Sequence, residues 1–183
     1  MRILVTGRPG VGKTTLVSKV AQGLRERGVS VGGMITYETR ERGVRTGFLV
    51  EDLKTGLKGM MASVNYTSGP RVGKYVVSLM EIERVGVNAI LDAVARDMVV
   101  IIDEIGPMEL YSEAFKKAVS EAFSSAKSVV ATIHYRASQN SFCRRIVSLE
   151  GVLTYVVRLD NRNVLPRIIL SQLFPASSTA VPQ

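Results

Sequence analysis

A glycine-rich stretch near the start of the chain limits the possible folds more than any other part of the sequence. Residues 7–14 read Gly-Arg-Pro-Gly-Val-Gly-Lys-Thr and match the pattern Gly-x-x-x-x-Gly-Lys-Ser/Thr at every fixed position. An apolar, β-rich run, residues 2–6, precedes the stretch, and apolar residues recur at helical spacing after Thr14. A strand, a glycine loop and a helix in this order form a cradle of backbone N–H groups that suits a phosphate. The chain is therefore expected to bind phosphate groups here.

The residues of this loop have separate expected roles. The loop amides would surround the β-phosphate, Lys13 would bridge the β- and γ-phosphates, and the Thr14 hydroxyl would hold Mg²⁺. Lys13 is expected to be catalytic as well, because its charge stabilises the γ-phosphate oxygens during reaction. The predicted nucleotide-binding residues of the loop are Gly7, Arg8, Pro9, Gly10, Val11, Gly12, Lys13, Thr14 and Thr15.

A second motif follows a continuous apolar run, residues 98–102, of the kind buried on both faces in a parallel sheet. Asp103 and Glu104 come directly after it, at the carboxyl end of the strand, where open α/β sheets bind ligands. Asp103 is predicted to be a Mg²⁺ ligand. Glu104 is predicted to be a catalytic base that polarises the attacking water, a group that a small-molecule kinase does not need.

The remainder of the chain alternates between short apolar runs and amphipathic segments. Residues 34–50 are predicted to form an antiparallel hairpin, and residues 57–62 and 75–79 a further short pair. Helices are predicted over residues 81–96, 113–125, 139–149 and 163–174, and strands over residues 128–133 and 152–157.

This alternation predicts an α/β fold of the P-loop NTPase type. It would be a three-layer sandwich around a mainly parallel sheet, with right-handed crossovers and the antiparallel hairpin as an insertion. Residues 1–174 are expected to form a single domain. Residues 175–183, small and rich in proline and serine, are expected to be a mobile C-terminal tail.

Composition narrows the class of protein further. One cysteine and one histidine, Cys143 and His134, exclude an internal disulfide and a multi-histidine metal centre. Since the apolar runs are far shorter than the roughly 18 residues of a membrane helix, we expect a cytoplasmic protein without membrane contact. The net charge of +8 would attract nucleic acid as well as nucleotides, but no nucleic-acid-binding motif accompanies it. A monomer that binds nucleoside triphosphate is the expectation.

Four stretches of the sequence, the glycine-rich one among them, make the chain resemble a known family. They are residues 7–16, the hairpin residues 33–48, residues 71–77, and Asp-Glu-Ile-Gly-Pro-Met-Glu-Leu at 103–110; residues 160–163 form a weaker fifth. Together they resemble the small P-loop nucleoside-triphosphatase family first described from thermophiles, which includes the human cancer-related nucleoside-triphosphatase. Arg8 departs from the small or apolar residue that is more common in the family.

The resemblance implies Mg²⁺-dependent hydrolysis of ATP, GTP and other nucleoside triphosphates to diphosphate and phosphate, slow in turnover and broad in base. Arg40, Arg45 and Arg71 lie in family-matching segments and are candidates for an arginine that faces the γ-phosphate. His134, with Thr132, is a candidate for a contact with the γ-phosphate or water. Arg162 is a predicted nucleotide-binding residue that would stack on the base.

Two alternatives share the same core. A nucleoside or small-molecule kinase would need a second pocket for its acceptor and a lid, for which residues 63–74 are the candidate. A nucleic-acid-linked ATPase would explain the positive charge and would show hydrolysis stimulated by DNA or RNA in a salt-sensitive way. The adjacent Asp103 and Glu104 weigh against the kinase, and no helicase-like motif or second domain supports the nucleic-acid-linked ATPase.

Overall fold

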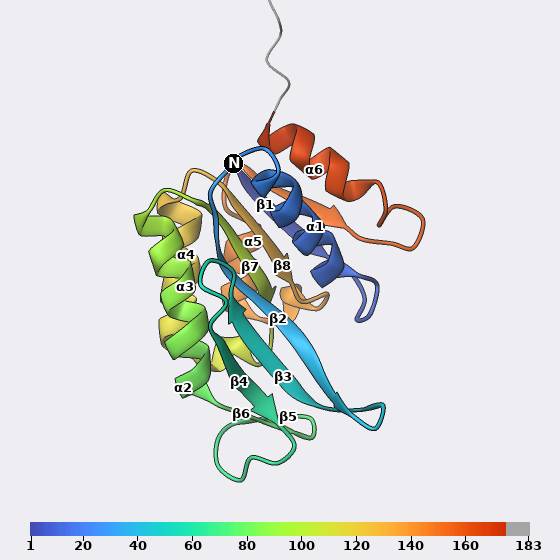
Figure 1. Cartoon of the computed structure of the whole chain (residues 1–183), viewed down its shortest axis with the longest axis vertical. Coiled ribbons are helices and arrows are strands. Elements are labelled where there is room, and N and C mark those ends of the chain that lie inside the picture. The colour runs from blue at the N-terminus through green and yellow to red at the C-terminus, as the bar shows by residue number, and fades with distance from the viewer. Residues whose placement is uncertain (175–183) are drawn as a thin grey trace, which may run out of the picture.

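The computed structural model describes residues 1–174, and the expected mobile tail lies outside the described residues. Within residues 1–174, nine strands form one sheet in the order β5-β6-β4-β3-β2-β7-β8-β1-β9, flanked on both faces by helices (Figure 1). The strands are β1 (Arg2–Thr6), β2 (Val31–Glu41), β3 (Val44–Asp52), β4 (Lys58–Ser63), β5 (Arg71–Val72), β6 (Tyr75–Val77), β7 (Val99–Ile105), β8 (Val129–Ile133) and β9 (Val152–Val156).

The helical segments lie between these strands along the chain. They are α1 (Lys13–Arg25), α2 (Leu79–Glu81), η1 (Ile82–Val87), α3 (Asn88–Ala95), η2 (Glu109–Tyr111), α4 (Glu113–Ser125), η3 (Ala137–Gln139), α5 (Ser141–Val147) and α6 (Leu165–Leu173). The predicted helix at 113–125 has the observed bounds of α4.

The sheet has a parallel part and an antiparallel part, which meet at β2. Strands β2, β7, β8, β1 and β9 pair in parallel. Strands β3, β4, β6 and β5 continue the sheet from β2 by antiparallel pairing. The mainly parallel sheet with an antiparallel hairpin is thus confirmed, and β8 lies between the strands that lead to Lys13 and Asp103.

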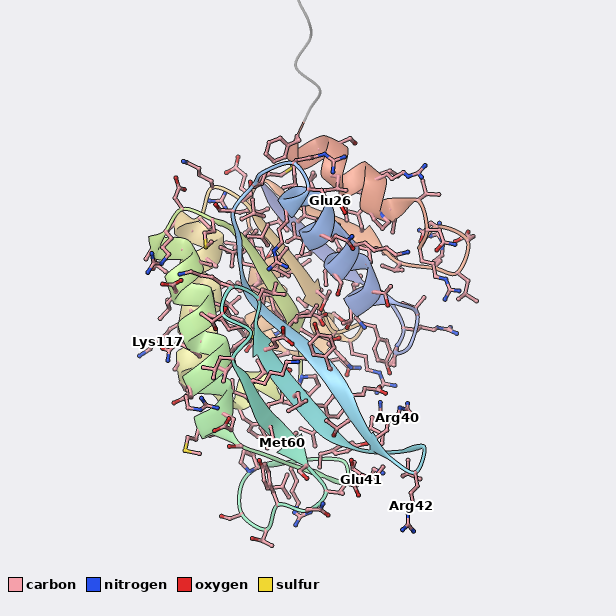
Figure 2. All side chains as sticks on the ribbon, in the orientation of Figure 1. Glu26, Arg40, Glu41, Arg42, Met60 and Lys117 are labelled. Atoms are coloured by element: carbon pink, nitrogen blue, oxygen red, sulfur yellow. The ribbon has the colours of Figure 1, made fainter. Side chains whose placement is uncertain are left out.

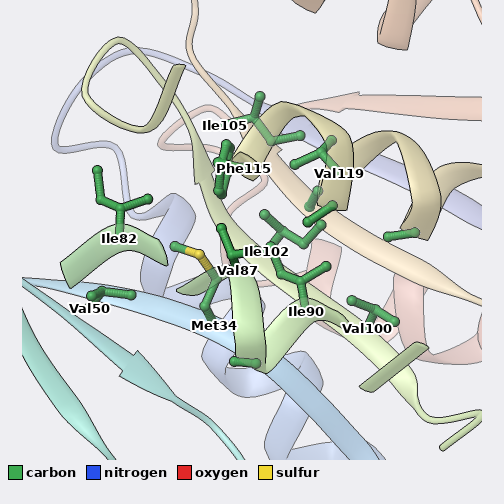
Figure 3. Packing of buried hydrophobic residues seen from close by; sticks show 14 of the residues in the cluster. Met34, Val50, Ile82, Val87, Ile90, Val100, Ile102, Ile105, Phe115 and Val119 are labelled. Atoms are coloured by element: carbon green, nitrogen blue, oxygen red, sulfur yellow. The ribbon is translucent and has the colours of Figure 1, made fainter. Parts of the chain in front are cut away.

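Two hydrophobic cores cover the two faces of the sheet. Because side chains alternate along a strand, Val100 and Ile102 of β7 pack against the face of α3 and α4, whereas Ile101 packs on the face of α1 and α6. Figure 3 shows the first of these cores, where Phe115 of α4 lies beside the β7 residues. Every apolar residue from Val100 to Ile102 is fully buried, which explains the continuous apolar run.

One predicted element differs in its detail. The apolar spacing over residues 81–96 predicts one regular helix, but the structure has α2, the wider π-helical segment η1 and then α3. Ile82, Val85 and Val87 of η1 are nevertheless buried in the core, so the π-helical winding directs the same apolar residues inward. None of the helices among residues 1–174 has the length and hydropathy needed to cross a membrane.

Candidate functional site

The glycine-rich stretch forms a loop between the end of β1 and the start of α1. Gly12 directly precedes the helix with φ of 107°, a left-handed conformation that glycine adopts without strain. No side chain caps the first turn of α1, which leaves N–H groups at this end of the helix for a ligand. Arg8 is exposed on this loop. The loop therefore has the shape that binds phosphate at a helix N-terminus.

Lys13 is held at the base of the loop. Its side chain is only 8% exposed, and its Nζ lies 3.3 Å from the carbonyl oxygen of Gly7 and 3.2 Å from Oε2 of Glu104. Glu104 is partly exposed and comes from the end of β7. The structure thus brings together the two residues that the sequence predicted to be catalytic.

Asp103 is fully buried at the end of β7 and is surrounded by hydroxyl groups. Thr14 donates a hydrogen bond to Oδ2 at 2.8 Å, and Thr132 of β8 donates to Oδ1 at 2.6 Å. Thr36 of β2 lies 3.4 Å from Oδ2. Burial raises the pKa of Asp103, and the hydrogen bonds from Thr132 and Thr14 oppose that rise. The hydroxyl of Thr132, which is predicted to contact phosphate or water, thus donates to this carboxylate in the structure.

Thr14 and Asp103 fit a Mg²⁺ ion bound together with a nucleotide. Hydroxyl and carboxylate oxygens are the protein ligands that Mg²⁺ takes, with phosphate oxygens and water completing the shell. Within residues 1–174 there is no group of three or more His, Cys, Asp or Glu able to hold a metal by themselves. The donor set therefore suits a metal that arrives with phosphate.

Glu109 also belongs to the site, although the sequence around it predicts no role for it. It is 5% exposed in η2 and lines the same cleft as Glu104. A Cβ on Gly106 would lie 3.1 Å from a carboxylate oxygen of each, so glycine lets the two acids approach. Burial and the neighbouring charge of Glu104 raise the pKa of Glu109 to about 8. The short turn after Gly106-Pro107 carries no periodic signal, so the burial of Glu109 was not predictable.

His134 lies at the end of β8 between the phosphate cleft and a neighbouring cavity. Its Nδ1 accepts a hydrogen bond from the backbone N–H of Arg136 at 3.3 Å, which places the proton of a neutral imidazole on Nε2. Burial and the charges of Lys13 and Arg136 lower the pKa of His134. The histidine is therefore neutral at pH 7 and can donate from Nε2.

The three candidate arginines occupy different places. Arg45 lines the cleft, donates to Glu38 and to the Tyr75 hydroxyl, and stacks 5.3 Å from the Phe48 ring. Arg40 pairs with the same Glu38 near the hairpin turn, where Figure 2 shows it beside Arg42. Arg71 lines the neighbouring cavity instead. Of the three, Arg45 alone lines the phosphate cleft.

The cleft itself has a volume of about 530 Å³. A separate hollow of about 230 Å³ lies beside it, and Arg162 lines this hollow together with Gly12 and Thr15. Arg162 therefore lies next to the end of the loop at which α1 begins. The cleft is lined by Pro9, Gly10, Gly12, Lys13, Thr14, Thr15, Thr36, Tyr37, Glu38, Arg45, Phe48, Val72, Glu104, Gly106, Pro107, Met108, Glu109 and His134.

Comparison with known proteins agrees with this geometry. A model of the family described as NTPase matches residues 2–170. The chain belongs to this NTPase family. The nucleoside-triphosphatase THEP1 of Thermofilum pendens, a relative, is 56% identical over 163 residues, which are 89% of this chain and 90% of the relative.

Solved structures of NTPase family members confirm the fold class. The crystal structure of THEP1 from the hyperthermophile Aquifex aeolicus has a TM-score of 0.83 and 34% identity, covering 95% of this chain and 99% of that one. The solution structure of a human cancer-related nucleoside triphosphatase has a TM-score of 0.82 and 33% identity, covering 96% and 98%. The family resemblance and the P-loop fold expected from the sequence are therefore confirmed.

Proposed function

We propose that this chain hydrolyses nucleoside triphosphates, ATP and GTP among them, to nucleoside diphosphate and phosphate with Mg²⁺. The observation that carries the proposal is the meeting of the phosphate loop with the β7 acids, with Lys13 Nζ 3.2 Å from Glu104 Oε2. The relatives' name, nucleoside-triphosphatase, supports the same reaction type.

The phosphate chain would lie along the loop, with its negative charge on the N–H groups at the start of α1. Lys13 would bind the β- and γ-phosphates. Its ammonium lies at the base of the loop, between the carbonyl oxygen of Gly7 and the carboxylate of Glu104. Its low exposure makes the charge more effective on the γ-phosphate oxygens than it would be in water.

Thr14 and Asp103 would hold Mg²⁺, which neutralises charge on the phosphate oxygens. The hydroxyl of Thr132 holds the Asp103 carboxylate in place by donating to the oxygen that does not face Thr14. The other carboxylate oxygen, Oδ2, faces Thr14, the second proposed Mg²⁺ ligand.

Glu104 would take the proton of the attacking water. When the phosphates compete for Lys13, the carboxylate loses its ion pair and becomes available to water. Glu109, with a pKa of about 8, is protonated at pH 7 and so adds no second negative charge beside the base. A single charged carboxylate at this position limits repulsion of the γ-phosphate.

We further propose that Arg162 packs against the base and that base selectivity is low. The hollow beside the loop is lined by Arg162, Asn163 and Lys19. Within residues 1–174 no side-chain hydrogen bond holds any of the three in a position to recognise the edge of one particular base. Stacking on a guanidinium depends on the π-face that every base has. The proposal therefore predicts similar rates for purine and pyrimidine triphosphates.

The test is phosphate release by purified protein with Mg²⁺ and each of ATP, GTP, CTP and UTP, with water as the sole acceptor. We expect release from all four, with rates within about tenfold of one another, since stacking discriminates weakly. The same reactions are repeated with candidate nucleosides and small alcohols and analysed for phosphorylated products. Phosphate transfer to an organic acceptor with negligible release in water alone would replace the hydrolase by a kinase.

A further inference from the structure

A second cavity lies beside the phosphate cleft and has no part in the proposed hydrolysis. Its volume is about 520 Å³, within the range of small-molecule sites. Strand β5, the η2 turn and the segment from His134 to α5 surround it. Its lining residues include Arg71, Pro107, Leu110, Tyr111, His134 and Arg136.

The charge of this cavity is positive and uncompensated. Two arginines, Arg71 and Arg136, are among its lining residues, and no aspartate or glutamate is. Within residues 1–174 neither guanidinium forms an ion pair or donates a side-chain hydrogen bond, whereas Arg45 of the cleft is bound to Glu38. Arg136 only stacks on Tyr135 at 5.1 Å. Two arginines at one cavity, with no ion pair to neutralise them, are suited to a phosphate, phosphonate or carboxylate group.

The remaining walls suit an organic body rather than an inorganic ion. Leu110, Pro107 and the buried Cys143 supply apolar surface, and Tyr111 supplies an aromatic ring. The Tyr111 hydroxyl lies 3.3 Å from the backbone oxygen of Arg71, which joins the η2 side of the cavity to the β5 side. An orthophosphate ion would fill only a small part of this volume.

The cavity also adjoins the reacting end of the nucleotide site. Val72, Pro107 and His134 line both spaces. Because Nδ1 of His134 is occupied by the Arg136 N–H, the remaining ring donor is Nε2. A molecule in the second cavity would therefore lie next to the γ-phosphate end of the cleft.

We propose that this cavity is a second ligand site, which binds a small organic anion with an apolar or aromatic body while triphosphate occupies the cleft. Arg71 and Arg136 hold its anionic group, and the wall of Leu110, Pro107 and Tyr111 holds its body. This assignment concerns the binding of a second molecule and does not depend on which nucleophile attacks the triphosphate.

The test uses the ring C–H signals of His134 in NMR, which are unambiguous because the chain has one histidine. The cleft is first saturated with Mg²⁺ and a non-hydrolysable β,γ-imido triphosphate, and phenylphosphonate is then titrated. We expect a saturable shift of the His134 signals. Orthophosphate should bind at least about fivefold more weakly because it lacks the apolar body. Benzyl alcohol, which lacks the charge, should give no saturable shift.

The double variant Arg71→Gln/Arg136→Gln should weaken phenylphosphonate binding at least about tenfold, since each removes a charge-assisted donor. The matched control is Arg42→Gln/Arg167→Gln, which removes the same charge from two exposed residues outside both cavities and should change affinity less than about twofold. Unchanged affinity of both double variants for the imido triphosphate would show that the nucleotide site is intact.

Three results would overturn the assignment. One is loss of phenylphosphonate binding once the cleft is saturated, which would place the anion in the phosphate loop. Another is an equal loss of phenylphosphonate affinity in the two double variants, which would show that only the net charge of the protein matters. The third is orthophosphate binding as tightly as phenylphosphonate, which would make the site one for inorganic phosphate.

Discussion

The two walls of the phosphate cleft carry carboxylates in opposite environments. The sheet-end wall consists of the ends of β1, β7 and β8 with the η2 turn. Two of its acids, Asp103 and Glu109, are at most 5% exposed, and the side chain of a third, Glu104, is 24% exposed. The hairpin wall consists of β2 and β3, and its acid Glu38 has a side chain that is 41% exposed. Arg40 and Arg45 both pair with Glu38.

This difference reverses the direction of the pKa shifts. Burial raises the pKa of Asp103 and of Glu109, in the second case with help from the charge of Glu104. Partial burial also acts to raise the pKa of Glu38, but its hydrogen bonds with Arg40 and Arg45 outweigh burial and hold it below its usual value. The sheet-end wall thus holds buried carboxyl groups, whose ionisation is unfavourable, at the proposed phosphate and metal positions. The hairpin wall instead carries a surface network of ion pairs.

The largest effect should come from the sheet-end wall, in the variant Lys13→Ala. It removes the charge that binds the β- and γ-phosphates and leaves Glu104 without its ion pair. Turnover should fall to the detection limit, and triphosphate affinity should fall by roughly 30-fold or more, since truncation of a buried charge partner costs about 2–5 kcal/mol. Calorimetric titration and phosphate release measure the two quantities.

Lys117→Ala is the matched control for that variant. Lys117 is an exposed lysine of α4, away from the cleft, as Figure 2 shows. Affinity and turnover should equal those of the parent. Retention of turnover in Lys13→Ala would contradict the central role given to the sheet-end wall.

Glu104→Gln should separate binding from chemistry on the same wall. Glutamine keeps the shape of the side chain but cannot take a proton from water, and general-base catalysis contributes about 10² to 10⁴ in rate. Single-turnover hydrolysis should fall by that factor while triphosphate affinity changes little. Glu26→Gln, at the exposed end of α1, is the control. A Glu104→Gln rate within about threefold of the parent, against this expected loss, would remove Glu104 from the mechanism.

Most of the sheet-end wall was predictable because local sequence specifies it. The pattern of residues 7–14 predicts a strand before the loop and a helix after it, and the continuous apolar run before Asp103 predicts a central strand. Parallel pairing then brings the carboxyl ends of β1 and β7 to one edge of the sheet. The meeting of Lys13, Asp103 and Glu104 follows from these local signals and the rules of α/β topology.

The contacts that were not predictable depend on residues far apart in the sequence or on segments without a period. Thr36 reaches Asp103 from another strand, and Arg45 reaches Tyr75 across the antiparallel sheet. Glu109 lies in a short turn whose burial is decided by the elements around it. The π-helical winding of η1 was not predictable either, because an apolar spacing does not distinguish a π-helical segment from an α-helix.

Glu109→Gln tests the comparison between the two walls through its effect on stability. The pKa of Glu109 is raised from 4.5 to about 8, so the folded chain binds a proton that the unfolded chain releases between these values. The free energy of unfolding should therefore decrease as pH rises from about 4.5 to 8, by an amount on the order of a few kcal/mol. Glutamine cannot ionise, so the variant should lose this decrease, as measured by urea unfolding at several pH values.

The smallest effect should come from the hairpin wall, in the variant Glu38→Gln. Because the folded-state pKa of Glu38 is below 4.5, its stabilising contribution is complete above the unfolded value and is lost as pH falls through the folded value. Exposed pairs contribute little, so the variant should cost less than about 1 kcal/mol at pH 7 and nothing at a pH below the folded pKa. High salt should shrink the difference at pH 7 further.

Glu41→Gln is the control for Glu38→Gln, since Glu41 is exposed in the same hairpin and forms no ion pair with any residue in 1–174 (Figure 2). Its stability should follow the parent at every pH. If Glu38→Gln instead costs several kcal/mol at pH 7, the arginine network is structural and the contrast between the walls fails. If Glu38→Gln and Glu41→Gln behave alike across the acid range, Arg40 and Arg45 do not lower the Glu38 pKa in solution. The contrast stands only if the Glu109 variant changes the slope of stability with pH in one direction and the Glu38 variant changes it, more weakly, in the other.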